Sequence, residues 1–131
     1  MGGPAVLKKG FKQMMAEANA VIDNISADAA LELIDDADAV FVDVREAGER
    51  AQGFIPNSVH APRGFLEFIA DPEGPMHVSE VSPEKRLILY CGSGGRSALA
   101  AKTLHDMGFP RVASLVGGFP AWTEAGGSLE S

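Results

Sequence analysis

The sequence contains one segment whose residue types and spacing could do chemistry: a cysteine followed by a glycine-rich turn and an arginine. Cys91 is the only cysteine among 131 residues, and the residues after it are Gly92-Ser93-Gly94-Gly95-Arg96-Ser97. Glycines let the backbone turn so that several N–H groups converge on one point and form a cradle for an anion. Such a cradle stabilises a thiolate, so we expect the pKa of Cys91 to be lowered. The guanidinium of Arg96 would add a fixed positive charge for an oxyanion.

Other interpretations of this segment have less support from its residues. A lone cysteine is often only a small, buried, apolar side chain. A phosphate-binding P-loop needs lysine where Arg96 stands, and a dinucleotide fingerprint needs glycine where Ser97 stands. A serine-hydrolase elbow centred on Ser93 needs glycine where Cys91 stands. These three motifs are therefore excluded, and a reactive thiolate is the chemistry that the segment favours.

The elements on either side of Cys91 predict how it is positioned. Residues 86–90 are an apolar run, typical of a strand that is covered on both faces, and residues 97–108 have the apolar spacing of a helix that a glycine ends. A strand, a helix and a further strand in this order predict a βαβ unit in a parallel sheet, and ligands bind at the carboxyl edge of such sheets. The other strands are expected at residues 24–26, 39–44 and 111–116.

The first 23 residues are expected to be an N-terminal helical element, and residues 24–131 a single α/β domain. Apolar residues recur at helical spacing over residues 5–22, behind Pro4, which suits the first turn of a helix. We expect this amphipathic helix to pack its apolar stripe on the domain. Contact with a second copy of the chain or with a membrane surface is the alternative.

Shorter signals indicate local structure. Ser26 is expected to cap the start of a second helix. Residues 62–83 contain four prolines, so we expect one short helix near the start of this segment and then an irregular loop. Asp43 and Arg45 lie where a strand ends and are expected to form a structural ion pair, with Glu49 as a candidate third member.

Composition narrows the class of protein. Apolar residues make up 46% of the chain and charged residues 22%, which is typical of a soluble globular domain rather than a disordered or fibrous chain. The net charge of −7 repels phosphate backbones at long range, so no nucleic-acid partner is expected. One cysteine and three scattered histidines exclude an internal disulfide and disfavour a metal site. No apolar run suits a signal peptide or a membrane span, so a cytoplasmic protein is expected.

Four stretches of the sequence resemble motifs of the single-domain rhodaneses, a family of sulfurtransferases. They are residues 43–46 with Glu49, 53–58, 91–97 and 117–122, which are similar to the family's D-V-R-E, G-H-I-P-G-A, C-x-x-G-x-R-S and G-G-x-x-A-W motifs, respectively. Their order and spacing agree over about residues 25–127, so the N-terminal helix lies outside the resemblance. Phe54 and Asn57 replace the usual histidine and glycine of one turn, which concerns local packing more than chemistry.

The resemblance implies a three-layer α/β sandwich with a central, five-stranded parallel sheet and helices on both faces. It also implies that the Cys91 thiolate takes the outer sulfur of a small anionic donor such as thiosulfate, forms a persulfide and passes the sulfur to cyanide or a thiol. A sulfur-acceptor protein is a further candidate partner, and no cofactor is expected. Arg63 could assist anion binding or be an ordinary surface charge. The expected substrate-binding residues are Gly92, Ser93, Gly94, Gly95, Arg96 and Arg63.

Two alternatives share the fold that this family implies. Cysteine phosphatases place five residues between the cysteine and the arginine of their loop, whereas four residues separate Cys91 from Arg96. The tighter loop resembles the sulfur-handling branch and disfavours a phosphatase. A catalytically inactive interaction module needs neither residue, so their retention argues against this second alternative.

Overall fold

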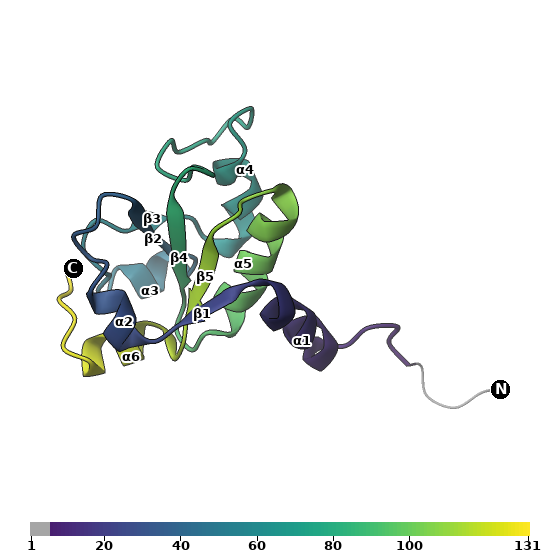
Figure 1. Cartoon of the computed structure of the whole chain (residues 1–131), viewed down its shortest axis with the longest axis horizontal. Coiled ribbons are helices and arrows are strands. Elements are labelled where there is room, and N and C mark those ends of the chain that lie inside the picture. The colour runs from purple at the N-terminus through teal and green to yellow at the C-terminus, as the bar shows by residue number, and fades with distance from the viewer. Residues whose placement is uncertain (1–5) are drawn as a thin grey trace.

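Five parallel strands form the central sheet of the structure, a computed structural model that describes residues 6–131 (Figure 1). The strand order is β1-β5-β4-β2-β3, and the neighbouring strands are parallel. The strands are β1 (Asp23–Ile25), β2 (Ala39–Asp43), β3 (Val59–His60), β4 (Arg86–Tyr90) and β5 (Val112–Leu115). The helices are α1 (Phe11–Val21), α2 (Ala27–Leu31), α3 (Ala47–Arg50), the 3₁₀ helix η1 (Arg63–Phe65), α4 (Leu66–Ala70), α5 (Gly95–Met107) and α6 (Gly118–Glu124). The predicted α/β fold with a five-stranded parallel sheet is confirmed.

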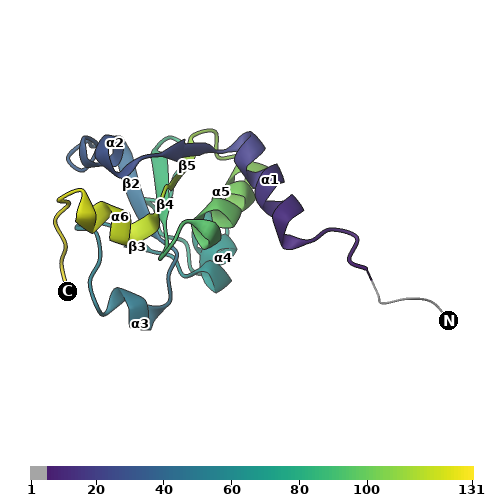
Figure 2. The ribbon, with the colours of Figure 1, turned by 90° about the horizontal axis from the view of Figure 1, so that it is seen from below.

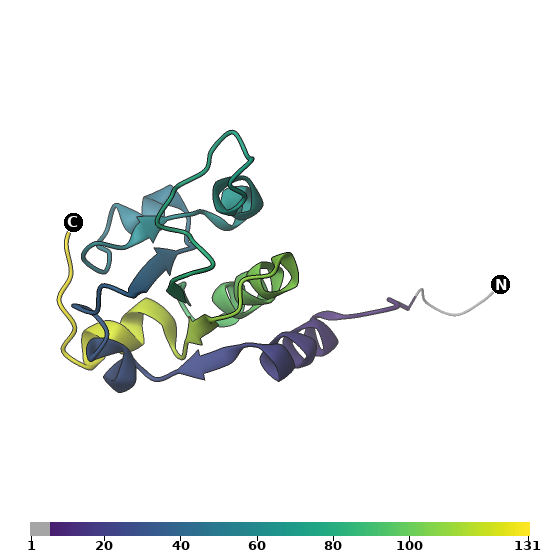
Figure 3. The same cartoon turned by 45° about the horizontal axis from the view of Figure 1, so that its top comes forward.

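Helices cover both faces of this sheet, as Figures 2 and 3 show. Along β4, Leu87 and Leu89 join the core beneath α1, α4 and α5, whereas Ile88 and Tyr90 join the core beneath α2 and α6. All four side chains are fully buried. Because successive side chains of a strand point to opposite faces, two covered faces require an apolar run without a polar face. The two covered faces of the sheet therefore explain why residues 86–90 are an apolar run.

The carboxyl ends of the strands meet at one edge of the sheet, because the strands are parallel. Cys91 follows β4 directly at this edge, and α5 begins at Gly95. The start of α6 packs against the same turn, where the Phe119 N–H donates to the Cys91 carbonyl at 2.8 Å. Gly118 has a φ of +65°, and a Cβ at this position would collide with the Cys91 carbonyl. A glycine is therefore required where α6 meets the turn after β4.

The N-terminal helix is shorter than predicted. It begins at Phe11 rather than near residue 5, because Gly10 is extended, with φ −96° and ψ 179°, and glycine disfavours a helix. Pro4, the expected first residue of the helix, lies outside the described residues. α1 packs on α5, and Ala18 and Ile22 are buried there. The inner part of the apolar stripe therefore packs on the domain as predicted, while Phe11 at the start of the helix is exposed.

The shorter elements show which sequence signals are sufficient to predict local structure. The Ser26 hydroxyl caps α2 as predicted and accepts a hydrogen bond from the Ala29 N–H at 3.2 Å. Residues 62–83 form η1, α4 and then an irregular loop, also as predicted. β3 and α3 have only two and four residues, too few to give a periodic pattern, and no expectation covered them. None of the helices within residues 6–131 is long and apolar enough to cross a membrane.

Candidate active site

The sulfur of Cys91 lies at the centre of a ring of hydrogen-bond donors. Its Sγ accepts hydrogen bonds from the backbone N–H of Gly94 at 3.0 Å and of Ser97 at 3.4 Å, and the Ser97 Oγ lies 3.5 Å away. Gly94 adopts a left-handed conformation with φ +106°, which turns its N–H toward the sulfur. The glycine-rich segment therefore does form the cradle that its sequence indicates, at the N-terminus of α5.

The cradle lowers the pKa of Cys91. Burial raises the pKa of this thiol, since the side chain has no exposed surface. Hydrogen bonds from the Ser97 hydroxyl and from the N–H groups of Ser93, Ser97 and Gly94 stabilise the thiolate and outweigh the effect of burial. The direction agrees with the expectation from the sequence, and it depends on fixed dipoles rather than on a neighbouring base.

The guanidinium of Arg96 is held by a carboxylate on the neighbouring helix. Its Nη1 and Nη2 donate to Oε1 and Oε2 of Glu49 at 2.7 and 2.8 Å. This parallel, bidentate arrangement is the strongest geometry for an arginine–carboxylate pair. Arg96 lowers the pKa of Glu49 to about 2. The positive charge that was expected to hold an anion is therefore paired in this structure.

The first turn of α3 holds Glu49 in place. The Glu49 carboxylate also accepts the backbone N–H of Glu46 at 3.0 Å, in a capping box that begins α3. The buried carboxylate of Asp43 binds Arg45 at 2.9 Å and Arg50 at 3.1 Å. The predicted Asp43–Arg45 ion pair is thus present, but its third member is Arg50 rather than Glu49. The Glu49 carboxylate instead faces the loop after Cys91, where it binds Arg96.

Arg63 does not join the ring around the sulfur. Its guanidinium donates to Glu67 at 3.1 Å and to the hydroxyl of Thr103, on α5, at 3.1 Å. Thr103 lies seven residues beyond Arg96 in α5, which corresponds to roughly 10 Å along the helix axis. Among the residues expected to bind substrate, the structure thus groups residues 92–96 around Cys91 and places Arg63 elsewhere.

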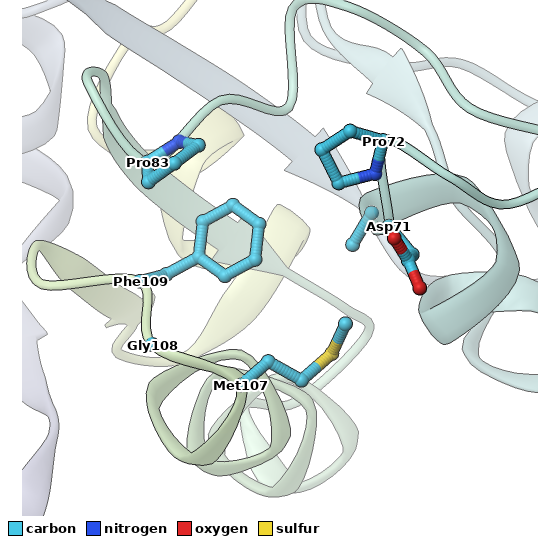
Figure 4. A pocket seen from close by; sticks show the side chains of 7 residues that line it. Asp71, Pro72, Pro83, Met107, Gly108 and Phe109 are labelled. Carbon is cyan, nitrogen blue, oxygen red and sulfur yellow. The ribbon is translucent and has the colours of Figure 1, made fainter.

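A pocket lies at the end of α5 opposite to the Cys91 cradle (Figure 4). Its volume is about 300 Å³, and it is lined by Ala70, Asp71, Pro72, Pro83, Met107, Gly108 and Phe109. Since α5 has 13 residues, this pocket is separated from the cradle by roughly 20 Å. A smaller pocket of about 230 Å³ lies beside the loop after Cys91. Ser93, Gly94 and Gly95 line one side of it, and the α1 residues Met15 and Asn19 line the other. Within residues 6–131, no three His, Cys, Asp or Glu side chains are grouped so that they could hold a metal ion.

The structure is an α/β domain with a five-stranded parallel sheet and a cysteine in an N–H cradle at the carboxyl edge of that sheet. The family comparison agrees with this class of domain. The model of the rhodanese-like domain matches residues 26–125, so the chain belongs to the rhodanese-like family. A sulfurtransferase of Allochromatium vinosum is 35% identical over 94 residues, which are 72% of this chain and 80% of that protein. The thiosulfate sulfurtransferase GlpE of Coxiella burnetii is 32% identical over 93 residues, which are 71% of this chain and 79% of that protein.

A similar solved structure comes from Rhodopseudomonas palustris and is described as a protein of unknown function and possible tyrosine phosphatase. It is 42% identical, with a TM-score of 0.89, and the match covers 98% of this chain and 100% of that chain. Because so much of this chain is covered, α1 is part of the shared structure, although the family model begins only at residue 26.

Two residues of the site were not assigned a role from the sequence. Glu49 belongs to the first of the four motifs, but the sequence placed it with the Asp43–Arg45 ion pair rather than with Arg96. Ser114, whose Oγ lies 2.7 Å from that of Ser97, is in the middle of β5 and has no motif signal. Only the strand register, which places Ser114 beside Leu89, brings it near the loop after β4.

Proposed function

We propose that this protein is a sulfurtransferase in which Cys91 carries the transferred sulfur. The observation that supports this most strongly is the convergence of backbone N–H groups on the buried Sγ, at a helix N-terminus. In the first step, the thiolate attacks the outer sulfur of a donor such as thiosulfate. A bond forms between Sγ and that sulfur, the donor's S–S bond breaks, and sulfite leaves with the bonding electron pair.

In the second step, an acceptor takes the sulfur from the Cys91 persulfide. Cyanide or a thiolate attacks the outer sulfur, the persulfide bond breaks, and its electron pair returns to Sγ as a thiolate. The products are thiocyanate or a persulfide of the acceptor, which is a small thiol or a sulfur-acceptor protein. Neither step needs a general base or a cofactor, since the nucleophile enters as a thiolate. With one cysteine in the chain, the acceptor must come from outside it.

The loop would serve both steps by stabilising charge on sulfur. The N–H groups of Gly94 and Ser97 already point at Sγ, so no reorganisation is needed when the thiolate forms. Arg96 has five N–H donors, and Glu49 accepts two of them. The other three N–H groups remain for the anionic end of the sulfur donor. The bound anion and the Glu49 carboxylate then compete for the positive charge of the guanidinium. Arg63 stays a candidate only for a donor that extends along α5.

A cysteine phosphatase is the second candidate, because the similar Rhodopseudomonas palustris structure is described as a possible tyrosine phosphatase. The loop argues for sulfur transfer, since only four residues separate Cys91 from Arg96 and the ring they form is narrower than a phosphate cradle needs. The curated relatives, which are named sulfurtransferases, support the same choice.

Mass spectrometry after incubation with thiosulfate tests the proposed function. We expect the wild-type protein to gain the mass of one sulfur atom, to lose it on addition of cyanide, and to gain none in Cys91→Ser. A protein that stays unmodified but hydrolyses a generic aryl phosphate would be a phosphatase. A protein that does neither would be an interaction module, and the sulfurtransferase proposal would be abandoned in both cases.

A further inference from the structure

A chain of buried hydroxyl groups extends from the sulfur of Cys91 into the sheet. The Ser97 Oγ lies 3.5 Å from Sγ and 2.7 Å from the Oγ of Ser114. Ser97 is fully buried and Ser114 is 2% exposed. The two hydroxyls come from different elements, α5 and β5, and they meet because Ser114 is paired with Leu89, two residues before Cys91. The sulfur is thus connected to the strand beside it through a single intervening side chain.

Counting hydrogens shows what Ser114 contributes. The Ser97 hydroxyl has one hydrogen, and it lies within reach of Sγ, of Ser114 Oγ and of the Gly94 carbonyl at 3.2 Å. A thiolate and a carbonyl can only accept. Among residues 6–131, Ser97 is the one hydrogen-bond partner of the Ser114 hydroxyl. When Ser114 donates to Ser97, the hydrogen of Ser97 is left for the sulfur or the Gly94 carbonyl, and a charged thiolate is the stronger acceptor of the two. The bond that Ser97 donates is then strengthened by polarisation.

We propose that Ser114 is a positioning residue for the reactive cysteine, acting through Ser97. With Cys91 as a thiolate, the hydrogen bonds run from Ser114 to Ser97 and from Ser97 to Sγ. With Cys91 as a thiol, the S–H donates to Ser97, whose hydrogen then goes to Gly94 or Ser114. Ser114 can donate to Ser97 in both states, but only in the thiolate state does the bond that it strengthens end on a charged sulfur. The second hydroxyl therefore stabilises the thiolate more than the thiol. This inference rests on the proposed role of Cys91 as the nucleophile.

The charged groups around the sulfur leave this role to the hydroxyls. Arg96 of α5 and Glu49 of α3 face the loop as a neutralised pair, and Asp43 of β2 is paired with Arg45. β5 carries no titratable residue. Two further pairs lie on the elements packed nearby, Glu17 of α1 with Lys9 and Lys102 with Asp106 of α5. The remaining titratable groups on these elements are Lys12 of α1, Asp23 of β1, His105 of α5 and Glu124 of α6, which are exposed, and Arg86 and Tyr90 of β4.

Alkylation of Cys91 by iodoacetamide, followed as a function of pH, tests the inference. The rate reports the thiolate fraction, and its midpoint gives the pKa of Cys91. Loss of one hydrogen bond should raise this pKa in Ser114→Ala by roughly half a unit to one unit, which lowers the alkylation rate below the pKa by roughly threefold to tenfold. Ser97→Ala, which loses the hydroxyl that contacts Sγ, should shift the pKa at least as far.

A pair of variants with nearly the same shape separates hydrogen bonding from packing. Ser114→Thr keeps the hydroxyl and should retain the wild-type pKa, whereas Ser114→Val should show the shift of Ser114→Ala. This pair decides the question even if Ser114→Ala is too unstable to study. Ser58→Ala is the control, because it removes a buried hydroxyl that bonds Tyr90 and Arg50 rather than the loop after Cys91.

Two results would overturn the inference: a wild-type pKa in Ser114→Val, or equal shifts in the threonine and valine variants. Because alkylation needs no sulfur donor, its outcome is independent of the thiosulfate experiment. A shifted pKa in a protein that takes up no sulfur would therefore reject the proposed function and leave the hydroxyl chain established.

Discussion

Arg96 and Glu49 join the loop that follows Cys91 to the helix that follows the neighbouring strand, through two parallel hydrogen bonds of 2.7 and 2.8 Å. Arg96 is in the first turn of α5, five residues after Cys91, and Glu49 lies in α3, after β2. The backbone of Gly92 lies directly beneath the pair, where a Cβ would come within 3.2 Å of Arg96 Nη2. The arginine that binds the anionic donor in our proposal is therefore oriented and neutralised by the same carboxylate.

Replacement of Glu49 by glutamine should strengthen the binding of an anionic donor. The variant keeps an oxygen that can orient Arg96 but removes the charge that competes with thiosulfate. Since the side chains of Arg96 and Glu49 are 41% and 38% exposed, solvent screens the pair, and we expect KM for thiosulfate to fall by up to roughly fivefold. Steady-state kinetics measure this, with Asp106→Asn as the control that neutralises a carboxylate elsewhere on α5. A higher KM in Glu49→Gln would contradict the argument.

The Glu49–Arg96 pair should also give a pH-dependent difference in stability. The pKa of Glu49 is lowered to about 2, below the value of 4.5 expected for the unfolded chain. The carboxylate therefore stabilises the fold fully above pH 4.5, and its contribution is lost as the pH falls toward 2. Because the pair is exposed, this contribution is at most about 1 kcal/mol.

Urea unfolding of wild type and Glu49→Gln between pH 2 and 6 measures this contribution. The difference in free energy of unfolding should be constant at the upper end of the range and vanish at the lower end. A difference that persists unchanged in acid would show that the glutamine variant is destabilised by packing, not by charge.

Asp43→Asn should be strongly destabilising. Asp43 is fully buried, and burial alone would raise the pKa of its carboxyl, yet the bonds from Arg45 and Arg50 lower it. Removing the charge leaves two arginines partly buried without their partner, which costs about 3–5 kcal/mol. Asp38→Asn, which breaks an exposed pair with Arg111, should cost far less stability, because solvent screens that pair. Urea unfolding compares the two, and similar losses in both variants would rule out a special role for Asp43.

Gly118→Ala should impair Cys91 through its backbone, without a contact to its sulfur. The new methyl group would displace the carbonyl of Cys91, and a misplaced nucleophile reduces turnover by roughly a hundredfold. Gly126→Ala is the matched control: its φ of +91° gives the same backbone strain, but nothing lies within 4 Å of its Cβ. Both variants should lose stability, and only Gly118→Ala should lose sulfur transfer. Equal loss of activity in both would refute this account.

The sequence predicted the parts of the fold that have strong local signals. The apolar run before Cys91 and the glycines after it indicated both the central strand and the cradle, because burial on two faces and a tight turn restrict the residue types there. The N-terminal helix was predicted too long, since the apolar pattern continues through Gly10 although the backbone at this residue is extended. Periodicity does not detect a helix start when the apolar residues before it are exposed.

The side-chain partners in the site could not be predicted, because they depend on the register and packing of distant segments. Glu49 was placed with Asp43 and Arg45, its neighbours in sequence, whereas its actual partner is Arg96, 47 residues away. Ser114 meets Ser97 only through the pairing of β5 with β4. Local spacing therefore indicates the candidate nucleophile, and only the three-dimensional arrangement shows which side chains lie around it.

The position of β4 at the centre of the sheet has a consequence for local unfolding. Strands at the edges of a sheet open more easily than those in its middle, and β3 and β1 at the edges have only two and three residues. β4 has a neighbour on both sides, so its amide hydrogens should exchange with solvent only when the whole molecule unfolds. Cys91 therefore follows directly after the strand that should unfold last. Local unfolding of β1 or β3 at the edges should leave the site intact.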